Sequence, residues 1–214
     1  MFRRMLAIGT CCALTAVAMA GTLEPTGKST DSKVPGEPGG QFTPDPTRTG
    51  INVDIDVTGI ESWDPVTDPS NTVLVIDVAA ALGLPSGTPV TMNGIGWDVT
   101  ITTNAPSWLS EARVYFDDNV APDLTGLFLA PGINDSFSGT GTYSSGGIIK
   151  LADAGIPDIP LPDGNLRVEF FESFDDFADG VDAVWAGTIT VQAVPEPGAL
   201  SLLALAGLAL IRRR

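Results

Sequence analysis

Short runs of alternating apolar and polar residues, separated by turn-forming residues, dominate this chain from residue 51 onward. Ile51–Val57 alternates strictly, so all four of its apolar side chains are expected on the core face of a strand. Trp108–Asp117 repeats the pattern, with Ala112, Val114 and Phe116 on one face. A period of two residues fits a β-strand and does not fit a helix, whose period is about 3.6 residues. The chain is therefore constrained to a fold of strands.

Further strand-like segments follow at short intervals between Gly, Pro and Asp turns. They comprise Asn71–Ala80, Pro89–Thr103, Leu124–Leu129, Asp135–Tyr143, Gly147–Leu151, Asn165–Phe171 and Ala183–Val191. Only Ala79–Leu84 and Ile149–Ala154 could support a helical turn, and Asn93-Gly94 indicates a turn or a bulge. About nine strands with so little helix predict an all-β, antiparallel β-sandwich of the jelly-roll type over residues 51–192. An immunoglobulin-like sandwich is the alternative.

The end of the chain has three successive features. Pro195-Glu196-Pro197 precedes an uncharged apolar run over residues 198–211, and Arg212, Arg213 and Arg214 follow it. The run predicts a transmembrane helix, although its fourteen residues are fewer than the roughly 17–25 of a full span. Arginines directly after such a run hold that end of the helix on the cytoplasmic side. The sequence thus predicts a short C-terminal membrane anchor.

The N-terminus carries a second targeting signal. Met1–Arg4 is basic, Leu6–Ala18 is apolar, and Ala18-Met19-Ala20 forms an A-x-A cleavage site. These features predict a signal helix over residues 1–20, which directs the chain to the general secretion translocon and is removed by signal peptidase between Ala20 and Gly21. Together the two signals predict that the residues between them are exported across the inner membrane.

The C-terminal segment resembles the PEP-CTERM sorting signal of exported bacterial proteins. Three parts match in order: the motif at residues 195–197, the apolar helix at 198–211 and the basic end at 212–214. In that family an exosortase, a membrane transpeptidase, recognises the motif. The resemblance implies that the inner membrane anchors the chain transiently and that the exosortase cuts near an extended, accessible Glu196. The domain is then released or attached at the cell surface.

Composition excludes several classes of protein. The chain has no histidine, and both cysteines, Cys11 and Cys12, lie in the predicted signal peptide. Ser-His-Asp, Cys-His and His-ligated metal chemistry are therefore excluded, and no disulfide holds the exported region. Five of the 11 basic residues lie in the two signals, which leaves six basic against 25 acidic residues in the region between them. So acidic a surface repels nucleic acid.

Residues 21–50 differ from the strand-rich region that follows. They are dense in Pro, Gly, Ser and Thr, and Phe42 is their only aromatic residue. Such a composition buries too little apolar surface to offset the entropy of ordering. A disordered linker is therefore expected between the signal peptide and the sandwich.

Acidic residues gather in one segment before the last predicted strand. They are Glu172, Asp175, Asp176, Asp179 and Asp182. Several carboxylates in one loop are the kind of ligand that Ca²⁺ prefers. The segment is predicted either to hold a structural calcium ion, with Asp175, Asp176, Asp179 and Asp182 as ligands, or to be a solvated acidic loop. A second, weaker calcium candidate consists of Asp117, Asp118, Asn119 and Asp123.

Four tryptophans are the candidates for stacking on sugar rings. Trp97 and Trp185 lie in strongly apolar segments, where core packing is expected. Trp63 and Trp108 lie at predicted strand edges or loops, where they either pack at the edge or bind a ligand. Trp63 and Trp108 are therefore the candidate contacts for an extracellular polysaccharide.

The stretch Asp135–Val191 loosely resembles the second half of jelly-roll modules such as the proprotein convertase P-domain. The shared features are Ser138-Gly139-Thr140, Pro162-Asp163-Gly164-Asn165-Leu166, the acidic loop and Val184-Trp185. The resemblance implies a common architecture, in which such loops often carry a structural calcium ion. It implies no common function.

Abundant acidic pairs raise a hydrolase as an alternative. A glycosidase needs two carboxylates about 5–9.5 Å apart in one cleft. Glu111 and Glu169 lie on predicted strands where alternation turns them outward, so no catalytic residue is assigned and no enzyme is predicted. The sequence predicts an exported structural or adhesive protein of the cell envelope or extracellular matrix. A secreted carbohydrate-binding module and a secreted glycoside hydrolase are the alternatives.

Overall fold

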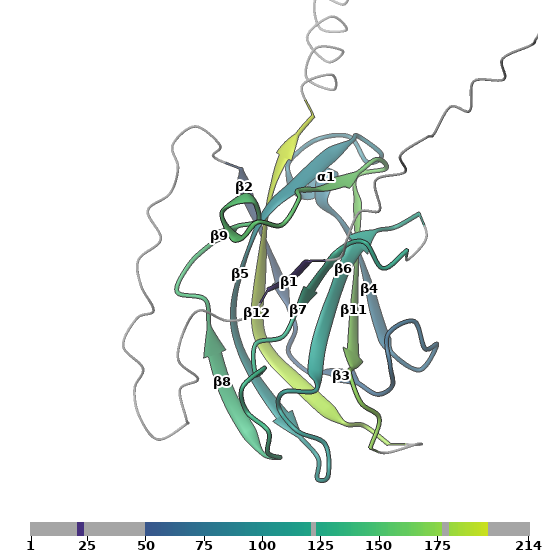
Figure 1. Cartoon of the computed structure of the whole chain (residues 1–214). Helices are drawn as coiled ribbons and strands as arrows, with labels where there is room; N and C mark the ends of the chain where they lie inside the picture. Colours follow the sequence, from purple (N-terminus) through teal and green to yellow (C-terminus); the bar gives the residue numbers. More distant parts are fainter. Residues whose placement is uncertain (1–20, 24–49, 121–122, 177–179, 197–214) are drawn as a thin grey trace, which may run out of the picture.

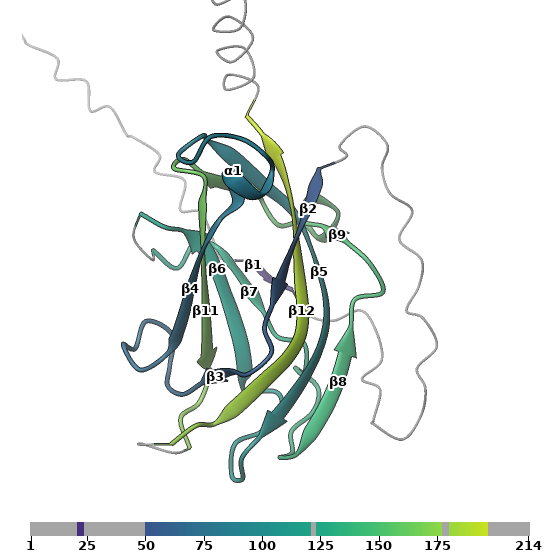
Figure 2. The same ribbon diagram turned by 180° about the vertical axis from the view of Figure 1, so that it is seen from behind.

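The structure, a computed structural model, describes residues 21–23, 50–120, 123–176 and 180–196. Within these residues two β-sheets pack face to face, with very little helix (Figures 1 and 2). The predicted β-sandwich is confirmed. The predicted signal helix over 1–20 and the apolar helix over 198–211 lie outside the described residues. In the described part, no helix is long and apolar enough to cross a membrane.

The first sheet has five strands in the order β1-β7-β6-β11-β4. Their bounds are Gly21–Leu23 for β1, Leu127–Leu129 for β7, Ala112–Asp118 for β6, Asn165–Glu172 for β11 and Thr72–Asp77 for β4. β1 runs parallel to β7, and the other described pairs of this sheet are antiparallel. The parallel pair is the one departure from the antiparallel pattern that the sequence predicts.

The second sheet has seven strands, with β10-β5-β12-β2 as its main path. β3 also pairs with β12, and β8 and β9 pair with β5. The bounds are Ile159–Leu161 for β10, Val90–Thr103 for β5, Ala183–Pro195 for β12, Ile51–Asp56 for β2, Ile60–Ser62 for β3, Thr140–Ser144 for β8 and Ile149–Lys150 for β9. All of these pairs are antiparallel.

Two short helical turns lie where the sequence allowed them. Helix α1 spans Val78–Ala81 directly after β4, and the Oδ1 of Asp77 accepts a hydrogen bond of 2.8 Å from the backbone N–H of Ala80. This cap satisfies a donor that the start of a helix otherwise leaves unpaired. The 3₁₀ turn η1 spans Ala152–Ala154 and ends at Gly155, which adopts a left-handed conformation.

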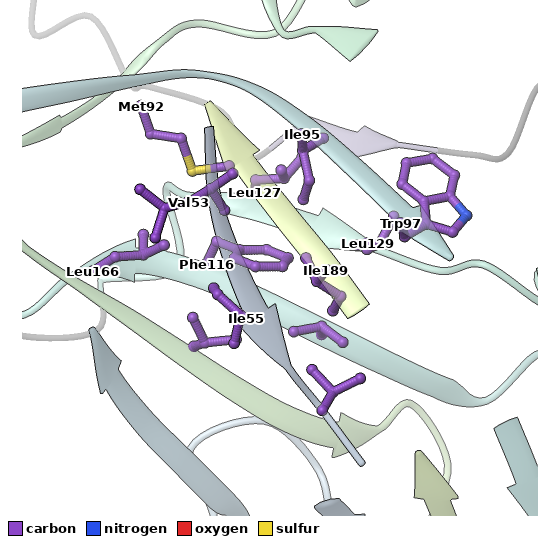
Figure 3. Close-up of a cluster of buried hydrophobic side chains, with 14 of the residues drawn as sticks. Val53, Ile55, Met92, Ile95, Trp97, Phe116, Leu127, Leu129, Leu166 and Ile189 are labelled. Carbon is purple, nitrogen blue, oxygen red and sulfur yellow. The ribbon is translucent and has the colours of Figure 1, made fainter. Parts of the chain in front are cut away.

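The core lies between the two sheets. Figure 3 shows side chains from β2, β5 and β12 meeting those from β6, β7 and β11, and ten of these residues are Val53, Ile55, Met92, Ile95, Trp97, Phe116, Leu127, Leu129, Leu166 and Ile189. Trp97 and Trp185 are buried, as predicted. Each large apolar side chain in such a place stabilises the fold by about 1.5–3 kcal/mol. Alternation along the strands therefore identified most of the core.

Ile51 is an exception to the predicted core. Val53, Ile55 and Val57 are buried, but the side chain of Ile51 is 51% exposed. Ile51 is the first residue of β2, and β2 is the outermost strand on the main path of the second sheet. The alternation thus indicated the correct face, while the position at a sheet corner removed the burial.

β5 and β12 form the longest strand pair of the second sheet. They are 14 and 13 residues long and pair along almost their whole length. The register shifts between Gln192 and Ala193, which face Gly94 and Met92, so Asn93 is the extra residue of a β-bulge. The predicted irregularity at Asn93-Gly94 is confirmed. Thirteen residues at about 3.3 Å each make β12 roughly 40 Å long.

Several segments differ from the predicted strands. Among them, β8 begins at Thr140 and β6 at Ala112, later than the predicted starts at Asp135 and Trp108. The sequence did not predict β3 or β10; β10 contains Pro160, which is tolerated because β10 lies at a sheet edge. The first three residues of the predicted linker form β1, while residues 24–49 lie outside the described part. β12 continues to Pro195 instead of ending at Val191, so the sandwich extends past residue 192.

The sandwich has two opposite ends, the β3 end and the α1 end. The β3 end is where β3, the start of β6, the end of β11 and the start of β12 meet (Figures 1 and 2). The α1 end is where α1, the end of β6, the start of β11 and the end of β12 lie. β12 connects the two ends.

Candidate functional site

The β3 end brings together most of the residues that the sequence proposed as a site. The backbone N–H of Glu172 donates to the carbonyl of Asp64 at 3.0 Å, and that of Asp182 donates to the carbonyl of Ser62 at 3.1 Å. The backbone N–H of Ser173 donates to the carbonyl of Glu111 at 2.9 Å. These bonds join the loop after β3, the loop before β6 and the acidic loop between β11 and β12.

Exposed aromatic side chains lie on the loops of this end. Trp108 is 45% exposed, Phe137 54% and Phe174 62%. The backbone N–H of Leu109 donates to the carbonyl of Phe137 at 3.0 Å, which places the loops of Trp108 and Phe137 side by side. Trp63, the other predicted contact, is half-buried. Phe137 and Phe174 were not predicted as contacts. Phe174 lies between two predicted strands, which was an available signal, whereas Phe137 lies within the segment Asp135–Tyr143 that was predicted as a strand, although β8 begins only at Thr140.

Two carboxylates are buried beneath these loops. Glu172 and Asp182 are both 0% exposed. The hydroxyl of Ser62 donates to Oε1 of Glu172 at 2.5 Å, and the hydroxyl of Ser107 donates to Oδ1 of Asp182 at 2.5 Å. The second oxygen of each carboxylate, Oε2 of Glu172 and Oδ2 of Asp182, is buried and has no hydrogen-bond partner among the residues that the structure describes. Each carboxylate is therefore half satisfied.

Burial raises the pKa of both carboxylates. Burial raises the pKa of Glu172 to about 8; the Ser62 hydrogen bond opposes this shift, and the charge of Asp182 adds to it. Burial also raises the pKa of Asp182 to about 6, with the Ser107 hydrogen bond opposing and the nearby acids Asp175, Asp176 and Asp64 contributing. Like charges and desolvation thus act together at this end.

The remaining acidic residues of the loop are less buried. Asp175 and Asp176 are half-buried, and Asp179 lies outside the described residues. Oε2 of Glu111 accepts a hydrogen bond of 2.7 Å from the backbone N–H of Trp108, and burial together with the neighbouring Asp176 raises the pKa of Glu111. In the described part of the chain, no three acidic side chains surround a common point in a way that could hold a metal ion. Among the predicted calcium ligands that the structure describes, Asp182 is the one that is fully buried.

The α1 end carries the second acidic group. Asp117, Asp118, Asp123 and Asp158 line an open pocket of about 360 Å³, with Pro157 and Pro160 among its other walls. Both oxygens of Asp117 already accept hydrogen bonds, from the Tyr115 hydroxyl and from backbone N–H groups. Oδ1 of Asp118 and Oδ1 of Asp123 accept from the backbone N–H groups of Val120 and Thr125 at 2.9 Å. The protein itself thus occupies much of the acceptor capacity of this second calcium candidate.

Glu169 is buried, contrary to the prediction that it faces solvent. It lies on the outer face of the first sheet, as alternation predicts, yet it is fully buried because the loop between β3 and β4 covers it. Its Oε1 accepts from the backbone N–H of Thr67 at 2.5 Å and from Nδ2 of Asn71 at 3.1 Å, and its Oε2 accepts from Arg167 at 2.5 Å. Glu169 is therefore a structural residue that holds this loop. Glu111 lies just before β6 and is partly buried, so it is not an outward strand residue either.

The predicted sorting motif, Pro195-Glu196-Pro197, begins inside the fold. Pro195 is the last residue of β12 and pairs with Val90 of β5. The backbone N–H of Glu196 donates to the carbonyl of Pro89 at 3.3 Å, and Glu196 is half-buried. Glu196 is therefore less accessible than expected, because sheet pairing continues into the motif. Pro197, the arginines Arg212–Arg214 and the cleavage-site residues Ala18 and Ala20 lie outside the described residues.

Comparisons with known proteins add only distant likenesses. The sequence matches no family model and no curated protein. Three solved structures of infectious bursal disease virus are similar in part: the Gx strain at 11% identity, the Gt strain at 13% and the VP2 subviral particle at 13%. They match over 75–82% of this chain with TM-scores of 0.29–0.30, and this chain spans only 37–40% of theirs. At such TM-scores the likeness supports no argument about fold or function.

Proposed function

We propose that the protein is an exported protein of the cell envelope or extracellular matrix, delivered by a C-terminal exosortase signal, with a structural or adhesive role. The observation that carries the proposal is the course of β12. It runs from Ala183 at the β3 end to Pro195 at the α1 end, where the Pro-Glu-Pro motif begins. A chain held through its C-terminal segment at the α1 end would present the aromatic and acidic loops of the β3 end outward.

We infer further that the sandwich is a jelly roll. In that fold eight strands in chain order form two sheets in the orders one-eight-three-six and two-seven-four-five. The eight main strands here are β2, β4, β5, β6, β7, β10, β11 and β12. The orders β2-β12-β5-β10 and β4-β11-β6-β7 support this assignment.

Processing at the motif is tested by the mass of the mature protein isolated from the surface of its host. Wild-type protein is expected to lack the C-terminal segment, while Glu196→Gln is expected to retain it, because the substitution removes the charge of the motif. Glu196 contacts Pro89 through its backbone, so the substitution leaves that bond in place. Glu61→Gln on β3 makes the same chemical change away from the motif and is expected to be cut normally. A mature surface protein that still ends at Arg214 would contradict the proposal.

Carbohydrate binding is a second candidate function. The observation that favours it is the presence of Trp108, Phe137 and Phe174, all strongly exposed, on loops at the same end as several carboxylates. Exposed aromatic faces flanked by polar groups can stack on sugar rings and hold their hydroxyls. We propose an extracellular polysaccharide as the ligand class.

Retention on insoluble polysaccharides tests this second function. Trp108→Ala is expected to lower retention at least several-fold, and Phe174→Ala to add to the loss. Val120→Ala is the matched control, because Val120 is 70% exposed but lies at the α1 end. Equal retention of wild type and Trp108→Ala would exclude this surface. Glu172 and Asp182 expose no surface to a substrate, so this pair does not support the hydrolase alternative.

A further inference from the structure

We infer that the β3 end binds a divalent cation of the hard, oxygen-preferring kind, such as Ca²⁺, between the buried carboxylates of Glu172 and Asp182. This inference is independent of the proposed sorting and adhesive function. It differs from the calcium loop predicted by the sequence, in which Asp175, Asp176 and Asp179 are ligands and Glu172 is not. The hydroxyls of Ser62 and Ser107 belong to the same site, since each is fully buried and bonded to one of the carboxylates.

Two buried carboxylate oxygens at the β3 end lack a partner. Oε2 of Glu172 and Oδ2 of Asp182 are buried and have no donor within the described residues, although buried polar atoms are nearly always paired. Leaving a buried acceptor unpaired costs about 1–3 kcal/mol, and more when the group is charged. Two such oxygens at one end of a fold, on separate carboxylates that interact electrostatically, indicate a missing partner that is positive.

Negatively charged side chains surround Glu172 and Asp182. Asp182 faces the charges of Asp64, Asp175 and Asp176, and Glu172 faces those of Glu111 and Asp182. Arg113 is the cation that acts on Glu172, and it is a single positive charge. The described positive charges near the pair do not balance its negative charges. A divalent cation bound between the two carboxylates would do so. In the absence of a cation, a proton on Glu172 relieves part of the repulsion.

The number of oxygen ligands at this end sets how tightly Ca²⁺ would bind. Ca²⁺ takes about six to eight oxygens at roughly 2.3–2.6 Å. Two carboxylates supply up to four oxygens and the two serine hydroxyls supply two more, so water completes the set. No three acidic side chains converge in the described part of the chain, so the cation is held by only two charges. A weak site in the range of extracellular modules, with a dissociation constant of about 10⁻⁴–10⁻³ M, is expected.

Thermal unfolding of the full-length chain in mild detergent tests the inference. At pH 8, Ca²⁺ at about a hundred times its dissociation constant is expected to raise Tm by about 5–10 °C relative to EDTA. Glu172→Gln and Asp182→Asn should each abolish most of this rise, while each amide keeps an oxygen that can accept from its serine hydroxyl. Asp118→Asn at the α1 end makes the same charge change and should leave the rise intact.

Terbium luminescence gives a second readout that does not depend on stability. The indole Nε1 of Trp185 donates to the Ser62 hydroxyl at 3.3 Å, so an ion at Glu172 lies close enough to a tryptophan for energy transfer. Wild-type protein excited through tryptophan should show Tb³⁺ emission that Ca²⁺ displaces, and Glu172→Gln should lose it. If wild type shows neither the emission nor a Tm rise, the pair holds only protons and the inference is wrong. The same conclusion follows if Asp118→Asn loses the response while Glu172→Gln keeps it.

Discussion

Both ends of the sandwich are rich in acidic residues. In the described part of the chain, burial raises carboxyl pKa values at the β3 end, while hydrogen bonds lower the pKa of exposed acids at both ends, as those from Ser70 do for Asp68 at the β3 end. At the α1 end, hydrogen bonds from Thr125 lower the pKa of Asp123, and those from Ser86 and Ala80 lower the pKa of Asp77. At the β3 end, burial raises the pKa of Glu172 to about 8 and that of Asp182 to about 6. Composition alone does not distinguish the two groups.

The difference lies in what the carboxylates accept. At the α1 end, exposed carboxylates cap turns and receive backbone N–H groups, which stabilise the charged form. At the β3 end, buried carboxylates each receive one serine hydroxyl and leave one oxygen unpaired. Turn capping stabilises the fold locally. Half-satisfied buried carboxylates destabilise it, which is the arrangement expected where a ligand completes the structure.

The largest expected effect on stability comes from Trp185, which lies beneath the loops of the β3 end. Trp185 is fully buried and packs edge-on against Phe170 at a centroid distance of 5.4 Å. Trp185→Ala is expected to lower the free energy of unfolding by about 3–5 kcal/mol, because it leaves a large cavity. Trp185→Phe should cost less, since it keeps an aromatic ring there. Urea unfolding measures both costs. A cost below about 1 kcal/mol for the alanine variant would show that Trp185 is not tightly packed.

The pH dependence of stability is expected to separate the two ends. The pKa of Glu172 is raised to about 8 from 4.5, so the folded state binds a proton that the unfolded state has lost over that range. In EDTA, the free energy of unfolding should therefore fall by on the order of 3 kcal/mol between pH 5 and pH 8. Acids with a lowered pKa at the α1 end act in the opposite direction, and their stabilisation is lost as the pH falls below about 4.

Glu172→Gln is the control for this slope. The amide cannot ionise, so the variant should unfold with a much flatter pH profile and should exceed wild type in stability at pH 8 without a cation. Asp123→Asn should leave the slope between pH 5 and 8 unchanged. A wild-type profile that is flat over this range would contradict the buried-acid description of the β3 end.

A smaller effect is expected at the α1 end. Asp163 accepts hydrogen bonds from the backbone N–H of Asn165 at 2.9 Å and from its Nδ2 at 3.0 Å, which fixes the turn before β11. Asp163→Ala should destabilise the fold by about 1 kcal/mol, while Asp163→Asn should cost less because the amide oxygen still accepts. Chemical denaturation at pH 7 compares the two. Equal costs would mean that charge, and not the turn hydrogen bonds, is what matters there.

The smallest effect on stability is expected at the exposed aromatic loops. The side chains of Trp108 and Phe174 are 45% and 62% exposed, so alanine at either position should change the free energy of unfolding by less than about 1 kcal/mol. The same substitutions are expected to reduce polysaccharide retention. A loss of stability above about 1 kcal/mol would assign these residues to packing instead of binding.

Local sequence pattern predicted the fold well where strands are long. The alternation around Val53 and Val114 identified core faces, and Asn93-Gly94 identified the bulge. It failed at β3 and β10, because three residues carry too little pattern, and at Ile51, because a sheet corner lies outside the core. The gathering of Trp63, Trp108 and the acidic loop at one end was not predictable, since it depends on how the two sheets pair.

The sequence by itself determined that the region after residue 20 has no cysteine and no histidine, is strongly acidic, and forms strands from residue 51, because composition and two-residue periodicity are local properties. Only the tertiary structure decided which acids are buried. Ser62 and Glu172 are 110 residues apart and Ser107 and Asp182 are 75 apart, yet each pair shares a hydrogen bond. The environment of a carboxylate is set by such long-range neighbours, so its charge at neutral pH follows from the packing of the two sheets and their loops.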